Sequence, residues 1–172
     1  RIRCKDTKPE ELVRKFLFSQ GFRYRKNNAR LPGKPDIVLP KYKTVIFVNG
    51  CFWHGHEGCK YFVWPKNNAE FWKEKIGKNI VRDRTNHQLL RAQGWKIIDV
   101  WECQLKKDSR GTTLGNLVRE IRSWFFWARR IFPKKTNFYK VEATLRYIKR
   151  KDLFKYFSTY TYSKRHEVFG TG

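Results

Sequence analysis

The chain has 172 residues, 40% of them hydrophobic and 17% aromatic, which is enough for one domain with a substantial core. Its net charge of +24 at pH 7 argues against an ordinary enzyme of neutral metabolites and indicates a polyanionic partner, most often nucleic acid. A basic surface without a specific partner, or a membrane-surface binder, is the alternative. No apolar run approaches the roughly 18 residues of a transmembrane helix, and no signal peptide is visible.

The first predicted element is a helix that begins after Thr7. Thr7 is its expected N-cap and Pro9 lies in the first turn. Glu10 stands three residues after the cap, so its plain role is the carboxylate of a capping box. Gly21 ends the helix, and residues 22–25 then alternate like a strand. The apolar side of the helix carries Leu12, Val13, Phe16 and Leu17.

A carboxylate stands at the head of the next predicted strand. Asp36 follows two prolines and a glycine and leads into apolar residues 37–39, so it is held rigidly at a sheet edge. Residues 43–48 form another strand, so Asp36 and Asn49 lie at neighbouring strand ends if the two strands form a hairpin or meander. Because aspartates often begin strands for turn reasons alone, both a turn role and a catalytic role remain open for Asp36.

Two cysteines and two histidines follow in one short loop. Four residues separate Cys51 from His56 and two separate His56 from Cys59, so this loop can wrap three ligands around one ion. Cys103, at the end of a distant predicted strand, can complete a closed Cys3His site, which suits a structural zinc. Reduced, buried thiols beside surface histidines are the alternative. His54 could also replace His56, but the choice of His56 leaves His54 free for another task.

The same loop carries two large aromatic residues, Phe52 and Trp53, where a ligand loop is expected to be small or polar. Core packing under the loop is their ordinary interpretation. Adjacent residues of an extended segment face opposite ways, so in that case at least one ring would be exposed.

A long helix is expected to start near Asn67 or Asn68 and to end at Gly94, with a possible kink at Gly77. Asp83 lies in a polar group in mid-helix, for which a solvated, salt-bridged face is the simplest interpretation. The predicted buried side consists of Phe71, Trp72, Ile76, Ile80, Leu89 and Leu90.

Residues 95–103 are the next predicted strand, and residues 113–132 form an amphipathic helix. The order of helix, strands, long helix, strand and helix predicts an α/β domain over residues 1–132, with a central mixed sheet flanked by helices. Residues 133–172 are a basic, aromatic C-terminal extension, which is either an arm against DNA or a loosely packed tail.

The sequence contains, in order, the blocks Leu31-Pro-Gly-Lys-Pro-Asp36-Ile-Val, Phe47-Val-Asn-Gly-Cys-Phe-Trp-His54, Phe71-Trp-Lys-Glu-Lys-Ile-Gly-Lys-Asn79, Arg82-Asp83-Arg84, Gly94-Trp95 and Val100-Trp-Glu-Cys103. Together these blocks resemble the very short patch repair (Vsr) DNA mismatch endonucleases. The similarity extends over roughly residues 1–125. It implies a restriction-endonuclease-like core that nicks one DNA strand beside a T:G mismatch left by deamination of 5-methylcytosine.

The resemblance also implies roles for individual residues. Asp36 matches a carboxylate that binds catalytic Mg²⁺, together with the backbone carbonyl at Val48. His54 matches the catalytic histidine that handles the attacking water, and Glu10 an acidic residue that engages metal-bound water. Asn49, in a catalytic position, departs from the family, which has His or Asp before Gly-Cys-Phe-Trp. An amide can hydrogen-bond water or phosphate but cannot accept the proton.

The structural zinc set of the family matches the Cys3His group, and Phe52 and Trp53 match aromatics that intercalate at the mismatch. Such insertion costs on the order of a few kcal/mol per base step, least at a mismatch. The long helix would bind phosphates. Its predicted DNA-binding residues are Lys73, Lys78, Asn79, Arg82 and Arg84.

The implied partner is mismatched double-stranded DNA, not a membrane. We expect a monomeric, cytoplasmic, nucleoid-associated protein of bacterial type, functionally linked to a DNA cytosine methyltransferase and to mismatch repair proteins. Because of Asn49, a zinc-stabilised DNA-binding module or a related restriction or repair nuclease with reduced cleavage remains an alternative. A zinc hydrolase with an open Cys/His site is a third possibility.

Overall fold

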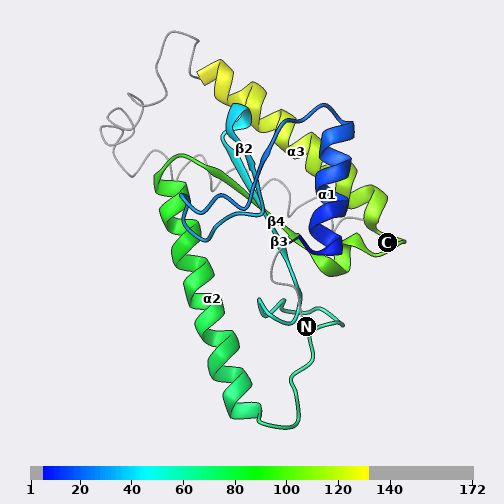
Figure 1. Ribbon diagram of the computed structural model, residues 1–172, viewed down its shortest axis with the longest axis vertical. Coiled ribbons are helices and arrows are strands. Elements are labelled where there is room, and N and C mark those ends of the chain that lie inside the picture. The colour runs from blue at the N-terminus through cyan, green and yellow to red at the C-terminus, as the bar shows by residue number, and fades with distance from the viewer. Residues whose placement is uncertain (1–5, 132–172) are drawn as a thin grey trace, which may run out of the picture. The chain divides into compact units, whose positions relative to one another are not determined.

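A computed structural model describes residues 6–131, with side chains through Phe125 (Figure 1). The predicted C-terminal extension lies outside the described residues. In this part of the chain, no helix is both long and apolar enough to cross a bilayer. The elements in order are α1 (Lys8–Ser19), β1 (Arg25–Lys26), β2 (Ile37–Leu39), the 3-10 helix η1 (Pro40–Tyr42), β3 (Thr44–Asn49), α2 (Ala69–Ala92), β4 (Lys96–Trp101), the 3-10 helix η2 (Glu102–Leu105) and α3 (Arg110–Ile131).

The four strands form one mixed sheet in the order β1-β2-β3-β4. The pairs β1–β2 and β2–β3 are antiparallel, whereas β3 and β4 are parallel, with α2 as the crossover between them. The predicted mixed sheet is therefore confirmed. Because β2 and β3 are antiparallel neighbours, Asp36 before β2 and Asn49 at the end of β3 lie at the same sheet edge, as expected.

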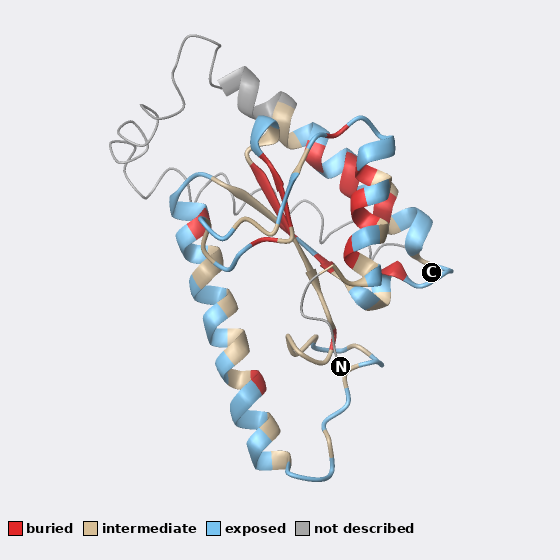
Figure 2. Cartoon of the chain, viewed as in Figure 1, coloured by how far each residue is buried: buried red, intermediate tan, exposed pale blue. Residues whose placement is uncertain are grey.

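Helices cover both faces of the sheet (Figure 1). On one face, α1 and α3 pack against alternate strand residues such as Ile46 and Val100, and together they form the larger core. On the other face, α2 contributes the buried Leu90 to a small cluster around Val38 and Val45. Figure 2 shows the consequence: buried residues concentrate on α1, α3 and the strands, while α2 is mostly exposed or half-buried.

The start of α1 follows the sequence prediction closely. Thr7 is the N-cap, and its side chain and that of Glu10 form a reciprocal capping box. Gly21 follows the helix with φ +82°, a left-handed conformation that glycine adopts without steric cost. The next segment differs from the prediction, because only Arg25–Lys26 pairs as a strand while Phe22 turns inward and is fully buried in the larger core.

The later elements are also displaced from their predicted bounds. The strand β4 ends at Trp101, so Cys103 lies in η2 rather than at a strand end. The last helix begins at Arg110, three residues earlier than predicted. The long helix α2 runs without a break through Gly77 and ends before Gly94, which has φ +72°.

The predicted buried side of α2 is only partly correct. Ile76 and Leu90 are fully buried, but Phe71 and Leu89 are about half exposed, at 54% and 49%. The reason is that α2 rests on the sheet only near its C-terminal end, through Leu90, and contacts the loop after β3 near its middle. The N-terminal part of α2 therefore has no sheet beneath it to cover Phe71.

Candidate active site

Asp36 is fixed at the sheet edge by the backbone of the neighbouring strand. Its Oδ2 accepts a hydrogen bond of 2.7 Å from the N–H of Val48. Burial raises the pKa of Asp36 to about 6; the nearby charge of Glu10 raises it as well, while the Val48 bond, Arg14 and His54 lower it. The carboxylate therefore lies within electrostatic reach of both Glu10 and His54, in a place where its negative charge is poorly solvated.

Glu10 is buried, with 4% of its surface exposed. Its carboxylate accepts hydrogen bonds from the N–H of Asp6 at 3.0 Å and from the Thr7 hydroxyl at 2.8 Å. Arg14, also buried, lies 3.5 Å from Glu10 and 2.8 Å from Asp6. The structure thus confirms the capping role of Glu10 and also places its charge close enough to affect Asp36.

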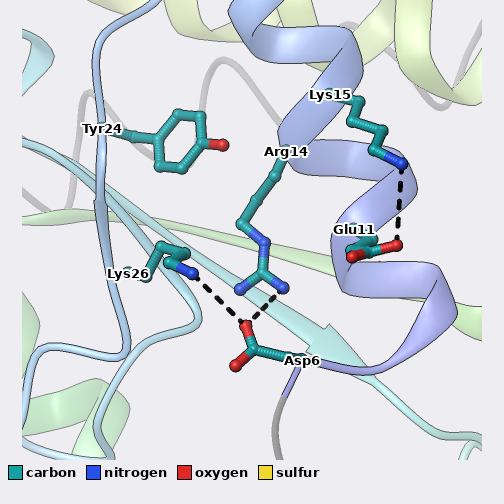
Figure 3. A pocket seen from close by; sticks show the side chains of 6 residues that line it. All are labelled: Asp6, Glu11, Arg14, Lys15, Tyr24 and Lys26. Atoms are coloured by element: carbon teal, nitrogen blue, oxygen red, sulfur yellow. Dashed lines mark ion pairs between the residues drawn. The ribbon is translucent and has the colours of Figure 1, made fainter.

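An open pocket lies beside the start of α1 (Figure 3). It contains three cationic side chains, but each faces a carboxylate. Arg14 and Lys26 approach Asp6 at 2.8 and 3.7 Å, and Lys15 approaches Glu11 at 3.7 Å. Because these cations are already partnered, we assign the pocket no ligand. Its lining residues are Asp6, Glu11, Arg14, Lys15, Tyr24 and Lys26.

His54 pairs with Asp83, which the sequence analysis had assigned to a solvated, salt-bridged face of the long helix. His54 Nδ1 lies 2.6 Å from Asp83 Oδ2, and each side chain is 28% exposed. Partial burial raises the pKa of Asp83, but the bond to His54 and the charges of His54 and Arg82 outweigh it, so the pKa lies below its usual value. An ionised Asp83 that holds Nδ1 leaves Nε2 of His54 able to accept a proton.

The loop that carries His54 is attached to the middle of α2. Asn79 donates a hydrogen bond of 3.0 Å from Nδ2 to the carbonyl of Trp53. Gly55 has φ +60° and packs so closely on α2 that an added Cβ would lie 2.8 Å from the Ile80 side chain. These contacts fix the position of His54 relative to Asp83.

Phe52 and Trp53 lie together, not on opposite sides of the loop. Residues 51–55 form a turn rather than an extended segment, so the predicted alternation was wrong. The two ring centroids are 5.3 Å apart, and Trp72 of α2 packs against both, at 5.2 and 5.9 Å. All three side chains are half-buried, outside the two core clusters of the sheet.

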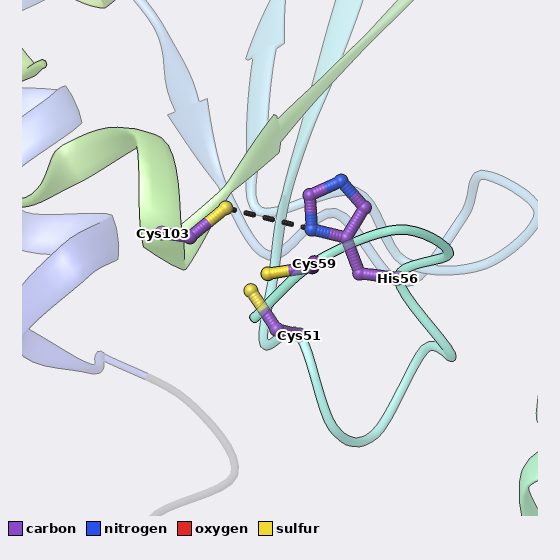
Figure 4. Close-up of side chains that lie close together, drawn as sticks. All are labelled: Cys51, His56, Cys59 and Cys103. Atoms are coloured by element: carbon purple, nitrogen blue, oxygen red, sulfur yellow. Dashed lines mark hydrogen bonds between the residues drawn. The ribbon is translucent and has the colours of Figure 1, made fainter. Parts of the chain in front are cut away.

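Four candidate metal ligands converge beside this loop (Figure 4). The ligand atoms of Cys51, His56, Cys59 and Cys103 all lie within 4.8 Å of one another, and Cys103 Sγ is 3.4 Å from His56 Nδ1. A tetrahedral zinc with Zn–S of ~2.3 Å and Zn–N of ~2.0 Å has edges of roughly 3.5–3.8 Å, so only small movements separate this group from that geometry.

The chemistry of the group also fits a metal ion. The His56 ring stacks on Trp101 at 3.9 Å with an interplanar angle of 2°, and burial lowers the pKa of His56, which favours the neutral ligand form. Burial raises the pKa of the Cys51 thiol to about 12, so a thiolate forms there only with a cation beside it. The structure therefore brings together a Cys3His group that can hold a metal ion.

Asn49, at the end of β3, is hydrogen-bonded to a residue that the sequence analysis did not single out. Its Nδ2 donates a hydrogen bond of 3.0 Å to Asp99 Oδ1, and His87 of α2 approaches the same oxygen at 3.6 Å. Burial raises the pKa of Asp99, while His87 and the Asn49 amide lower it. Phe47 packs against the His87 ring at 5.1 Å.

The predicted DNA-binding residues on α2 differ in their surroundings. Lys73 and Lys78 are exposed and lie near Glu70 and Glu74, respectively. Arg82 is exposed and bonds Asp83 at 3.1 Å. Arg84 is exposed, whereas Asn79 is half-buried and anchors the loop. DNA binding by these five residues stays a prediction.

Comparison with known proteins gives the family. The family model described as "DNA mismatch endonuclease Vsr" matches residues 1–60. The type II nicking enzyme V.NmeAIP of Neisseria meningitidis is 58% identical over 123 residues, 71% of this chain and 87% of the relative. This chain belongs to the Vsr family. The DNA mismatch endonuclease Vsr of Escherichia coli is 46% identical over 72% of the chain and 78% of its own length. The nicking enzyme V.XorIIP of Xanthomonas oryzae is also 46% identical, over 71% of the chain and 85% of its own length.

Membership of the Vsr family confirms the resemblance seen in the sequence blocks, and with it the prediction of a DNA-cleaving enzyme. Three residues at the site were missed from the sequence. Asp83 and Asp99 were missed because their partners lie 29 and 50 residues away in the chain. Trp72 was missed because the sequence analysis placed it on the buried side of the long helix. Two adjacent aromatic residues, Phe71 and Trp72, cannot both face the same side of a helix, and Phe71 is in fact exposed.

Proposed function

We propose that this Vsr family member is a Mg²⁺-dependent endonuclease that nicks one DNA strand next to a T:G mismatch, as in very short patch repair. The observation that carries the proposal is that Asp36, bound to the Val48 N–H, lies within the electrostatic influence of Glu10 and of His54, which is itself held by Asp83. The names of the relatives support it: one is a mismatch endonuclease and two are nicking enzymes. The sheet and helices are consistent with a restriction-endonuclease-like core, which we include in the proposal.

The residues at the sheet edge fit a magnesium ion. Asp36 offers a carboxylate oxygen, the hard ligand that Mg²⁺ prefers. The pKa of Asp36 is raised because its carboxylate is buried and because the negative charge of Glu10 lies nearby. A dication bound here would neutralise this negative charge. We assign Asp36 and the backbone carbonyl of Val48 as the ligands, with Glu10 acting through bound water. When bound, Mg²⁺ would stabilise the charge that develops on the phosphate.

The protein residues perform the remaining tasks. His54 accepts the proton of the attacking water at Nε2, because Asp83 occupies Nδ1 and stabilises the imidazolium that forms. Asn49 hydrogen-bonds water or phosphate at the same sheet edge.

We further propose that the Cys3His group holds a structural zinc. All four ligands come from the protein, which leaves no open position for a substrate and disfavours the catalytic zinc alternative. The zinc would fix the loop that carries Phe52 and Trp53, and these rings would enter the base stack at the mismatch. Their position supports that role, since neither of the two core clusters of the sheet includes them.

The DNA contacts follow from charge. The exposed Lys73, Lys78, Arg82 and Arg84 would neutralise phosphates along α2, in a chain with net charge +24. We include in the proposal a monomer that acts on double-stranded DNA in the bacterial cytoplasm. We also include a functional link to a DNA cytosine methyltransferase, whose 5-methylcytosine is the source of the T:G lesion.

The test is a nicking assay on a duplex with one T:G mismatch, with a T:A duplex of the same sequence as control. We expect Mg²⁺-dependent nicking of one strand of the mismatched duplex and its loss in Asp36→Ala. Cleavage that survives Asp36→Ala would exclude the assigned site. Because Asn49 is neutral, a DNA-binding module with reduced cleavage is the second candidate. Tight mismatch binding without any Mg²⁺-dependent nicking by the wild-type protein would favour it.

A further inference from the structure

Asn49 lies between the two candidate catalytic groups along the chain. It directly follows Val48, whose N–H binds Asp36, and it precedes the loop that carries His54. The charge of His54 affects both Asp36 and Asp99, the partner of Asn49, so these groups share one electrostatic environment. Asn49 therefore lies on the segment of the chain that joins the two candidate catalytic groups.

The sheet register explains how Asp99 reaches Asn49. In the parallel pair β3–β4, Asn49 lies opposite Trp101, and Phe47 lies opposite Asp99. Alternate residues share a face, so Asn49 and Asp99 project to the same side of neighbouring strands, two residues out of step. The bond between Nδ2 and Oδ1 at 3.0 Å spans this diagonal.

Asp99 is itself held in place from the helix side. His87 of α2 lies 3.6 Å from the same carboxylate oxygen, is only 18% exposed and packs against Phe47. Aspartate is depleted in strands, and Asp99 is the only acidic residue of β4, so the strand itself gives no reason for a carboxylate at this place. The strand β4 and the helix α2 thus hold the Asp99 carboxylate in place, and the Asn49 amide donates the shorter of its two polar contacts.

The direction of this hydrogen bond determines the orientation of the Asn49 side-chain amide. An ionised carboxylate only accepts hydrogen bonds, so the NH2 end of the amide must face Asp99 and the carbonyl oxygen must point away from it. Among the described residues, no donor binds that oxygen. Asn49 therefore presents an oriented acceptor oxygen at the end of β3.

We propose that Asp99 is a positioning residue that holds the Asn49 carboxamide with its oxygen directed to the attacking water. This inference rests on the proposed nuclease function. Because an amide oxygen accepts a hydrogen bond but not a proton, Asn49 orients the water while His54 takes the proton.

A double-mutant cycle tests whether Asp99 acts through Asn49. Single-turnover nicking rates of the T:G duplex are measured for wild type, Asn49→Ala, Asp99→Ala and the double variant at saturating enzyme. We expect each single variant to lose about 10–100-fold, as supporting residues of metal sites do, and the double variant to match Asn49→Ala within about twofold. Asp99→Asn, which keeps an acceptor oxygen, should recover most of the rate.

Losses that multiply in the double variant, or an unchanged rate in Asp99→Ala, would overturn the inference. If Asp99→Ala does not fold, Asp99→Leu, which fills the strand position, gives the same comparison. The proposed function is judged separately: if Asp36→Ala abolishes nicking while Asn49→Ala leaves the rate unchanged, the nuclease assignment stands and the role of the Asn49 pair falls.

A second readout needs neither DNA nor Mg²⁺. The side-chain amide signals of Asn49 in a nitrogen-15 NMR spectrum are identified by their loss in Asn49→Ala. We expect Asp99→Ala to shift them and Asp108→Ala, which removes an exposed carboxylate elsewhere, to leave them unchanged. Unshifted Asn49 amide signals in Asp99→Ala would show that the bond does not position this side chain.

Discussion

Replacement of Asp36 by Asn should make the metal-free protein more stable while abolishing nicking. Burial raises the pKa of Asp36 from 3.8 to about 6, which means that the folded state disfavours the ionised form. This rise in the pKa corresponds to at most roughly 3 kcal/mol of stability, since a tenfold change in a proton-binding constant is worth about 1.4 kcal/mol. Asn removes the charge and keeps an oxygen to accept the Val48 N–H, so this cost disappears.

The sign of the pH dependence is fixed by the raised pKa. The stability contributed by protonated Asp36 is fully present below about pH 4 and is lost as the pH rises through about 6. Urea unfolding in Mg²⁺-free buffer should therefore show Asp36→Asn more stable than wild type by up to roughly 3 kcal/mol at pH 7.5, with a much smaller difference at pH 4.5. Effects of pH on other groups cancel in this comparison.

Asp108→Asn is the matched control, because it removes an exposed carboxylate, and it should change stability by less than about 0.5 kcal/mol at either pH. Added Mg²⁺ should stabilise wild type but not Asp36→Asn. If Asp36→Asn destabilises the protein at pH 7.5, or if the difference does not shrink at pH 4.5, the burial argument for the magnesium site is wrong.

Three further outcomes follow from the site. Asp83→Asn should lower the single-turnover nicking rate by about 10²–10⁴-fold with DNA affinity unchanged, because it removes the charge that stabilises His54; a matching loss of affinity would contradict this role. Cys103→Ser should reduce bound zinc, measured by elemental analysis, and lower the melting temperature by roughly 10 °C or more, and full zinc content would refute the assigned fourth ligand. Trp53→Ala should weaken discrimination between T:G and T:A duplexes, measured by fluorescence anisotropy, more than total binding, whereas equal loss on both would count against insertion.

Local signals predicted the local structure well. The capping box of α1, the hairpin edge at Asp36 and the glycine that ends α2 all depend on residues close together in the chain, and each appears as expected. The grouping of Cys51, His56 and Cys59 also came from spacing within one loop. Cys103 was placed correctly near them, although it reaches the group from a 3-10 turn instead of a strand end.

The errors and omissions on the long helix have one physical origin, which is the position of α2. Periodicity shows which side of a helix is apolar, but not how much of the helix has a partner. Because α2 packs on the sheet only through its end near Leu90, Phe71 stays exposed, and Asp83 meets His54 instead of solvent. No pattern within α2 distinguishes a carboxylate in a surface ion pair from one that faces a histidine on another loop.

The segment between β3 and α2 explains why a catalytic fold of this kind would need a second, structural metal. Residues 50–68 contain neither helix nor strand, and Cys51 is the only one of them that is buried. Apolar burial therefore contributes little toward the entropy of ordering this segment, on the order of 1–2 kcal/mol per residue for the backbone alone. A zinc ion held by the proposed Cys3His site would supply on the order of 10 kcal/mol, at the base of the turn that carries Trp53 and His54. The contacts of α2 with Gly55, Trp53 and His54 determine the direction of the turn, and the proposed metal would add rigidity to it.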